Sequence, residues 1–176
     1  MFSRKISSSL EIKLSLPKYA PEIYALTDAN RDFLKEWLPW LDYTRSEDDT
    51  RSFIQEQLVR FSKGEAVHVT IFYEGVIVGV AGFNTIDQSN GIGYIGYWLA
   101  EGYNGKGIMT QVVSELVKMA REDLSLQKVD VRCATGNSKS RAIPERLGFA
   151  HEGTLRRAEK LYDRWVDHEV YALLID

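Results

Sequence analysis

The spacing of apolar residues changes period several times along the chain, and each change marks a new element. From Leu10 to Leu16, leucine and isoleucine alternate with polar residues, which is the two-residue period of a strand, and Pro17 ends this run. The spacing then becomes helical over residues 21–38. A break near residues 28–30 predicts two short helices there, and Pro39 closes the segment.

The next stretch predicts a helix followed by a hairpin. Ser46 and the three acidic residues after it provide a helix cap and favourable negative charge, and the apolar spacing carries this helix to about Lys63. Two strand-like runs follow, Val67–Tyr73 and Val76–Phe83. A Glu-Gly pair joins them, and a two-residue loop that ends in glycine is a hairpin signal.

The most informative segment runs from Ile92 to Arg121. Aromatic and β-branched residues up to Leu99 predict a strand, and an apolar stripe of helical period begins at Ile108. Between them, the small residues of Asn104–Gly107 let the backbone turn so that successive N–H groups and the helix N-terminus point at one spot. This arrangement binds anions, most often phosphate.

The remaining elements complete a mixed fold. The pattern predicts a strand over Lys128–Ala134, a short helix over Ser138–Leu147, and two final strands over Phe149–Glu159 and Trp165–Ile175. We therefore expect an α+β fold with a central, mostly antiparallel mixed sheet of about six to seven strands and helices on both faces. Residues 1–176 are expected to form a single domain.

Composition narrows the function. The chain has 176 residues, 44% hydrophobic and 27% charged, with a net charge of −3, which disfavours a general affinity for nucleic acid or anionic membranes. We find neither an apolar run of membrane-spanning length nor the apolar core of a signal peptide, so we expect a cytoplasmic protein. Cys133 is the only cysteine and is expected to be buried. The three histidines, His68, His151 and His168, have no metal-ligand or triad spacing.

Two nucleotide-binding patterns can be set aside by their context. The GxGxxG pattern of Gly91–Gly96 lies inside a predicted strand rather than between a strand and a helix, which disfavours a dinucleotide site. The glycines before Lys106 are too closely spaced for a P-loop, and Gly107 stands where serine or threonine must bind magnesium.

The Asn104–Met109 turn instead resembles the coenzyme-binding signature of the GNAT N-acetyltransferases, Gln/Arg-x-x-Gly-x-Gly/Ala. Asn104 and Met109 depart from it. The rest of the chain resembles the ribosomal-protein serine/alanine N-terminal acetyltransferase branch of that family almost end to end. The resemblance is carried by Glu36–Asp42, by Gly96–Leu99 leading into the turn, by Asn137 with Ser140, and by Leu147–Gly153.

This resemblance implies a cytoplasmic, acetyl-CoA-dependent N-acetyltransferase that transfers the acetyl group directly, needs no metal, and forms a homodimer. The acceptor would be the α-amine at the N-terminus of a protein, with a ribosomal protein as the candidate. It implies Glu159 as general base, Ser140 as the group that assists the leaving thiol, and Trp37 and Trp40 as a wall of the acceptor groove, although core packing is the other interpretation of these tryptophans. The implied coenzyme-binding residues are Trp98, Leu99, Asn104, Gly105, Lys106, Gly107, Ile108, Met109, Thr110 and Asn137.

Elementary chemistry favours an α-amine as acceptor. An α-amine with a pKa of about 7.7–8.0 is roughly one tenth neutral at pH 7, whereas lysine is neutral only about once in 2,500 molecules. One carboxylate such as Glu159 is therefore sufficient as base. Backbone N–H groups at the end of the Tyr97–Leu99 strand are candidates for polarising the thioester carbonyl. Two alternatives stay open, an acetyltransferase for a small amine, polyamine or antibiotic, and a non-catalytic acyl-CoA-binding module.

Pro144 adds one local expectation. Proline has no N–H, so within the predicted helix it leaves the carbonyl of Ser140 without its usual donor, close to the proposed site.

Overall fold

The computed structural model describes residues 3–176 of the chain. Eight strands form one sheet in the spatial order β1-β2-β3-β4-β5-β6-β8-β7. β5 and β6 are parallel, and the other neighbouring pairs are antiparallel. The strands are β1 (Ser3–Lys5), β2 (Leu10–Leu14), β3 (Val67–Tyr73), β4 (Val76–Asp87), β5 (Ile92–Leu99), β6 (Lys128–Ala134), β7 (Ala150–Leu161) and β8 (Arg164–Leu174).

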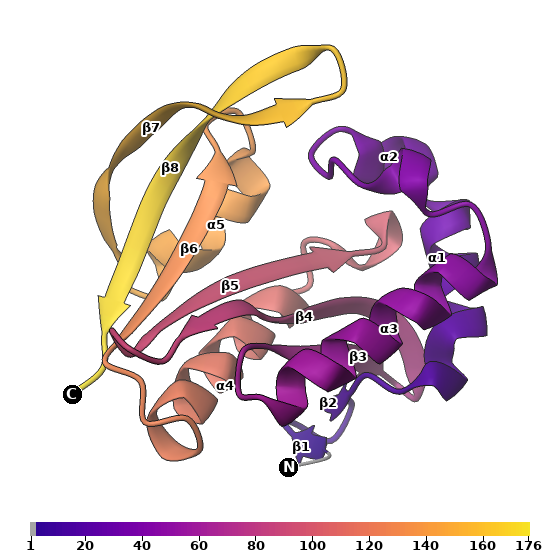
Figure 1. Ribbon diagram of the computed structural model, residues 1–176, viewed down its shortest axis with the longest axis horizontal. Helices are drawn as coiled ribbons and strands as arrows, with labels where there is room; N and C mark the ends of the chain where they lie inside the picture. Colours follow the sequence, from indigo (N-terminus) through magenta and orange to yellow (C-terminus); the bar gives the residue numbers. More distant parts are fainter. Residues whose placement is uncertain (1–2) are drawn as a thin grey trace.

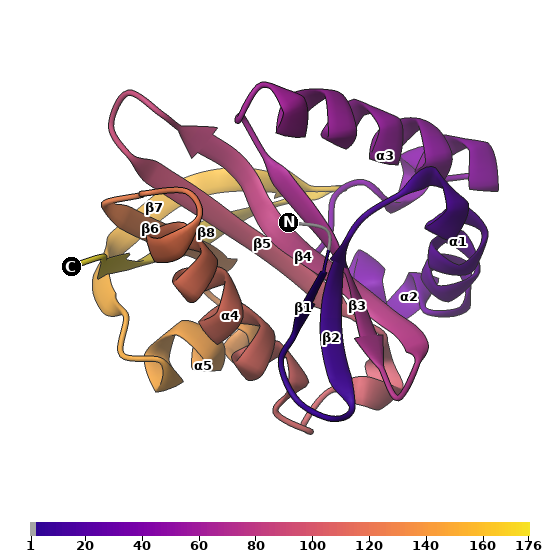
Figure 2. The same cartoon turned by 90° about the horizontal axis from the view of Figure 1, so that it is seen from below.

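Helices cover both faces of this sheet (Figure 2). They are α1 (Ala20–Ala29), α2 (Arg31–Lys35), α3 (Glu47–Ser62), α4 (Ile108–Glu122) and α5 (Ser138–Arg146), with short 3-10 turns at η1 (Pro17–Tyr19), η2 (Leu41–Tyr43) and η3 (Glu101–Tyr103). The apolar stripe of α4 buries Val112 and Leu116 in the larger core. α1 and α3 bury Ile23 and Ile54 in a smaller core on the opposite face. The predicted mixed sheet between two helical layers is confirmed.

The structure corrects three details of the expected elements. The sheet has eight strands rather than six to seven, because the three-residue β1 is too short to show a period. β4 continues four residues beyond the predicted end at Phe83, and a bulge between Phe83 and Thr85 lets it keep pairing with β5. β2 ends at Leu14, two residues early, because Pro17 already begins a 3-10 turn.

One irregularity of the sheet decides where a ligand could bind. β5 and β6 pair only over Ile92–Ile95, and beyond this point β6 turns away together with β8 and β7 (Figure 1). The N–H of Ala100 donates to Val78 of β4 at 2.9 Å. Since N–H groups alternate in direction along a strand, those of Tyr97 and Leu99 point away from β4. The carboxyl end of β5 therefore presents backbone donors where the two strands separate.

No helix within residues 3–176 combines the length and the apolar character needed to cross a membrane.

Candidate functional site

Two cavities meet where β5 and β6 separate. The smaller, about 340 Å³, reaches from the turn after β5 to the start of α5. The larger, about 900 Å³, crosses the sheet face that carries α1 and α3 and reaches the β7–β8 hairpin. The two cavities are continuous, because they share the lining residues Trp37, Leu38, Tyr97, Trp98, Asn137 and Ser140.

The turn before α4 has the backbone that its glycines permit. Gly105 and Gly107 have φ values of +80° and +73°, in the left-handed region that favours glycine. Among residues 3–176, no side chain caps α4, so the N–H groups of its first turn have no competing side-chain acceptor there. Such N–H groups at a helix N-terminus favour an anion. Asn104 closes the preceding 3-10 turn, because its Nδ2 donates to the carbonyls of Ala100 at 3.0 Å and Glu101 at 3.2 Å.

The residues expected to bind the coenzyme divide into two groups. One group lines the smaller cavity, and the other forms the turn and the beginning of α4. In the second group, Ile108 is buried in the core and Thr110 Oγ1 accepts a hydrogen bond from Arg146 at 2.8 Å. Lys106 lies near the rings of Tyr73 and Tyr103. The cavity-lining group comprises Trp98, Leu99, Asn104, Met109 and Asn137.

Ser140 is held at the junction of the cavities by three neighbours. Asn137 caps α5, with its Oδ1 accepting from the N–H of Ser140 at 3.3 Å. The Tyr97 hydroxyl donates at 2.9 Å to the carbonyl of Ser140, which Pro144 leaves free as expected. The Cys133 thiol donates to Ser140 Oγ at 3.4 Å. Burial raises the pKa of Cys133, so this thiol stays protonated and remains a donor.

Glu159 faces the larger cavity from β7. Its side chain is 29% exposed, and Oε1 lies 3.4 Å from Nε2 of His168 on β8. A bulge makes this possible, because β7 advances four residues from Leu155 to Glu159 while β8 advances only two. Arg157 sits in the bulge with φ +47°, and its N–H donates to Asp167 at 2.7 Å.

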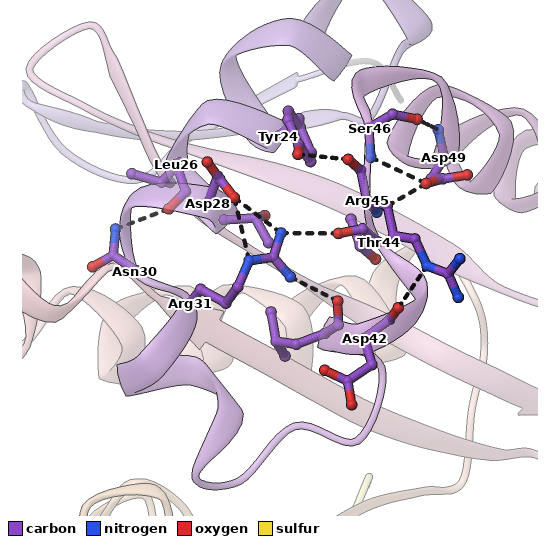
Figure 3. A network of polar contacts seen from close by, with 12 residues as sticks. Tyr24, Leu26, Asp28, Asn30, Arg31, Asp42, Thr44, Arg45, Ser46 and Asp49 are labelled. Carbon is purple, nitrogen blue, oxygen red and sulfur yellow. Dashed lines mark hydrogen bonds and ion pairs between the residues drawn. The ribbon is translucent and has the colours of Figure 1, made fainter.

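Trp37 and Trp40 line the larger cavity and stand outside the two buried core clusters. Their segment is fixed from α2, because the Arg31 guanidinium donates to the carbonyls of Leu41 at 2.7 Å and Thr44 at 2.9 Å (Figure 3). The Trp40 ring lies 6.3 Å from that of Trp98, tilted by 47°. The structure therefore brings both predicted tryptophans, Ser140 and Glu159 to one groove.

Sequence reasoning gave no role to the polar residues on the floor of this groove. His68 Nδ1 lies 2.8 Å from Ser15 Oγ, and burial lowers the pKa of His68 to about 4, so its ring is neutral at pH 7. Asp130 is buried, with Lys128 Nζ 3.5 Å from its Oδ1. His68, Asp130 and His168 line the larger cavity from β3, β6 and β8. To find them from the sequence would require the strand order as well as the period.

Within residues 3–176, no three histidine, cysteine, aspartate or glutamate side chains gather closely enough to hold a metal ion.

A family model described as an acetyltransferase (GNAT) domain matches residues 13–150. The chain belongs to the GNAT acetyltransferase family. A GNAT relative, the ribosomal-protein-serine acetyltransferase of Escherichia coli strain K12, is 34% identical, and the match covers 98% of this chain and 96% of that protein.

Two solved GNAT structures resemble this one over nearly the whole chain. RimL, a ribosomal alpha-N-protein acetyltransferase in complex with coenzyme A, superposes with a TM-score of 0.93 at 31% identity, covering 98% of this chain and 97% of RimL. MccE, the microcin C7 self immunity acetyltransferase in complex with acetyl-CoA and AMP, gives the same TM-score and identity, covering 97% and 95%. The predicted family, fold and reaction type are confirmed: the protein is an acetyl-CoA-dependent N-acetyltransferase of the GNAT family.

Proposed function

We propose that this enzyme acetylates the N-terminal α-amine of a protein, with a ribosomal protein as the candidate acceptor. The observation that carries the proposal is the groove of about 900 Å³ that runs from Ser140 past Glu159. This volume is near the upper end for small-molecule sites and leaves room for several residues of an extended chain. The ribosomal acceptors named for the relatives RimL and the Escherichia coli enzyme support the same acceptor class.

The smaller cavity and the turn suit the donor. Bound acetyl-CoA supplies the acetyl group as a thioester. The N–H groups of residues 105–109 would bind its diphosphate, because the left-handed glycines and the uncapped helix start direct donors at one point. Asn137 caps α5 through its Oδ1, and its amide Nδ2 would donate to the pantetheine arm.

Residues at the junction would assist the transfer itself. The N–H groups of Tyr97 and Leu99 would polarise the thioester carbonyl, since they point into the space between β5 and β6. Ser140 Oγ accepts from the Cys133 thiol, so the hydroxyl keeps its own proton for the departing thiolate.

Glu159 would accept the proton of the attacking amine, directly or through water. Its carboxylate faces the groove, and His168 beside it would orient it. A general base of this kind contributes about 10²–10⁴-fold to the rate, and this contribution is sufficient for an α-amine that is already partly neutral at pH 7.

The test uses peptides whose N-termini are free or blocked, with thiol release from acetyl-CoA as the readout. We expect turnover only with free N-termini and a loss of about 10²–10⁴-fold for Glu159→Gln. Glu152→Gln is the matched control, because Glu152 lies on the same strand but pairs with Lys128. Equal rates on blocked peptides would overturn the N-terminal acceptor, and an unimpaired Glu159→Gln would overturn the base.

A small-molecule acceptor is the second candidate, because MccE was solved with acetyl-CoA and AMP at 31% identity. A screen of small amines, polyamines and amine-bearing antibiotics separates the two candidates.

The cytoplasmic location and the homodimer stay predictions, and light scattering tests the homodimer. Trp165 is 58% exposed, so the core does not use this ring.

A further inference from the structure

The turn between β7 and β8 carries an unusual residue. Tyr162 and Asp163 form this two-residue connection, and Tyr162 has φ +57°, where asparagine or glycine is normally found. A bulky residue keeps such a backbone only where its surroundings stabilise it, and such positions cluster at functional sites. Here the Tyr162 hydroxyl donates to the carbonyl of Leu38 at 2.6 Å, across 124 positions of sequence.

Arg164, at the start of β8, reaches the same segment. Its Nη2 donates to the carbonyl of Glu36 at 2.7 Å, and its guanidinium lies over the Trp37 ring, 5.2 Å from the centroid. The hairpin tip therefore donates to the carbonyls on both sides of Trp37 and covers the face of its indole. We call the contacts of Tyr162 and Arg164 with residues 36–38 the tip clamp.

The outer edge of the Trp37 indole meets a second part of the site. A Cβ atom at Gly136 would lie 3.1 Å from Trp37 Cη2, so the glycine gives the ring room to approach the backbone between β6 and α5. Trp37 also lines both cavities. The ring is thus a shared wall of the two cavities, and its position depends on contacts at its face and at its edge.

We propose that Tyr162 and Arg164 are positioning residues for acetyl transfer, which act by holding Trp37 between the coenzyme arm and the acceptor. The inference rests on the proposed function only in that the larger cavity receives the acceptor. Neither residue needs to touch the reacting atoms. A displacement of about 1 Å in a positioning group can cost up to about 100-fold in rate, so loosening the ring should impair transfer more than coenzyme binding.

The first measurement follows Trp37 itself and needs no acceptor. The protein is labelled with 5-fluorotryptophan, and Trp37→Phe assigns its ¹⁹F resonance among the four tryptophans. We expect the Trp37 resonance to shift or broaden in Tyr162→Phe/Arg164→Gln. We expect no change in Lys160→Gln, the matched control, since Lys160 lies on the same hairpin and contacts Trp165. A Trp37 resonance that is unchanged in the double variant would overturn the proposal.

The second measurement is kinetic. In Tyr162→Phe/Arg164→Gln we expect kcat/KM for a peptide acceptor to fall about 5–20-fold, while the Kd of coenzyme A stays within about twofold. In a Trp37→Leu background the same two substitutions should reduce kcat/KM by less than about twofold, because the clamp then has no ring to hold. When Arg164→Lys replaces Arg164→Gln in the double variant, the loss in kcat/KM should be smaller, because lysine keeps the charge and a donor.

Equal losses in both backgrounds would show that the tip residues act independently of Trp37 and would refute the clamp. Failure of the proposed function looks different, because the wild-type enzyme would then not turn over any peptide while the fluorine result would stand.

Discussion

Replacing Tyr97 by phenylalanine should reveal how much stability is lost because Pro144 in α5 has no N–H to donate. Pro144 cannot donate to the carbonyl of Ser140, and the Tyr97 hydroxyl supplies the missing hydrogen bond at 2.9 Å. Tyr97→Phe removes this donor and leaves a half-buried carbonyl to be satisfied by water. Leaving a buried polar group unsatisfied costs about 1–3 kcal/mol of stability. Because this carbonyl is partly exposed, we expect Tyr97→Phe to lower the free energy of unfolding by about 1–2 kcal/mol.

The same geometry predicts a rescue. Pro144→Ala restores an N–H four residues after Ser140, which is the natural helical donor for that carbonyl. In the Tyr97→Phe background this second substitution should recover about 1 kcal/mol relative to additivity. In an otherwise wild-type chain it should gain little from this hydrogen bond, because the tyrosine already satisfies the carbonyl.

Urea denaturation of the four proteins of this cycle measures the coupling, and calorimetry should find Tyr97→Phe melting roughly 2–8 °C lower than wild type. Tyr94→Phe is the matched control on the same strand, where the ring packs near Arg132, and it should change stability by less than about 0.5 kcal/mol. Strict additivity of Tyr97→Phe and Pro144→Ala would show that the two residues do not act on one carbonyl.

Three further predictions concern the turn, the groove floor and the groove wall. Gly107→Ala should lower the free energy of unfolding by about 1–2 kcal/mol, because residue 107 has a left-handed backbone, and should weaken coenzyme A binding by up to about tenfold in calorimetry. Gly102→Ala, in equally open space but without a positive φ, should have neither effect. Because the pKa of His68 is lowered to about 4, the unfolded chain takes up its proton first as pH falls, so stability should be intact above about pH 6.5 and lose up to about 3 kcal/mol between pH 6.5 and 4. His68→Gln should flatten that part of the urea-midpoint profile, and an identical profile would exclude His68 as its cause. Arg31→Ala removes two hydrogen bonds, to the carbonyls of Leu41 and Thr44, and should lower the free energy of unfolding by about 1–3 kcal/mol. It should also raise KM for the acceptor. An unchanged KM would mean that the wall does not depend on Arg31.

The features that sequence predicted best are those that depend on near neighbours in the chain. The apolar stripe from Ile108 belongs to α4, and Ser46 caps α3 in a capping box with Asp49. The free carbonyl of Ser140 followed from Pro144 four residues later. Each of these depends on periods or offsets of a few residues, so no tertiary information was needed.

The missed features are contacts that depend on strand order, strand register or long-range packing. The donor to the Ser140 carbonyl, Tyr97, lies 43 positions away, and the bond from Tyr162 to Leu38 spans 124. The approach of His168 to Glu159 depends on a bulge that shifts the register of β7 by two residues. A period cannot reveal such pairings, because they are set by strand order and register rather than by the residues nearby.

The parallel pairing of β5 with β6, limited to four residue pairs, has a consequence for the enzyme as a whole. It divides the sheet into two hydrogen-bonded parts that share one short seam. The turn before α4 and Trp37 belong with the β1–β5 part, while Ser140 and Glu159 belong with the part formed by β6, β8 and β7. The angle at this seam therefore sets the distance between the turn before α4 and Glu159, the proposed base. The hydrogen bonds of Tyr162 to Leu38 and of Arg164 to Glu36 join the two parts across the opening and would hold that angle.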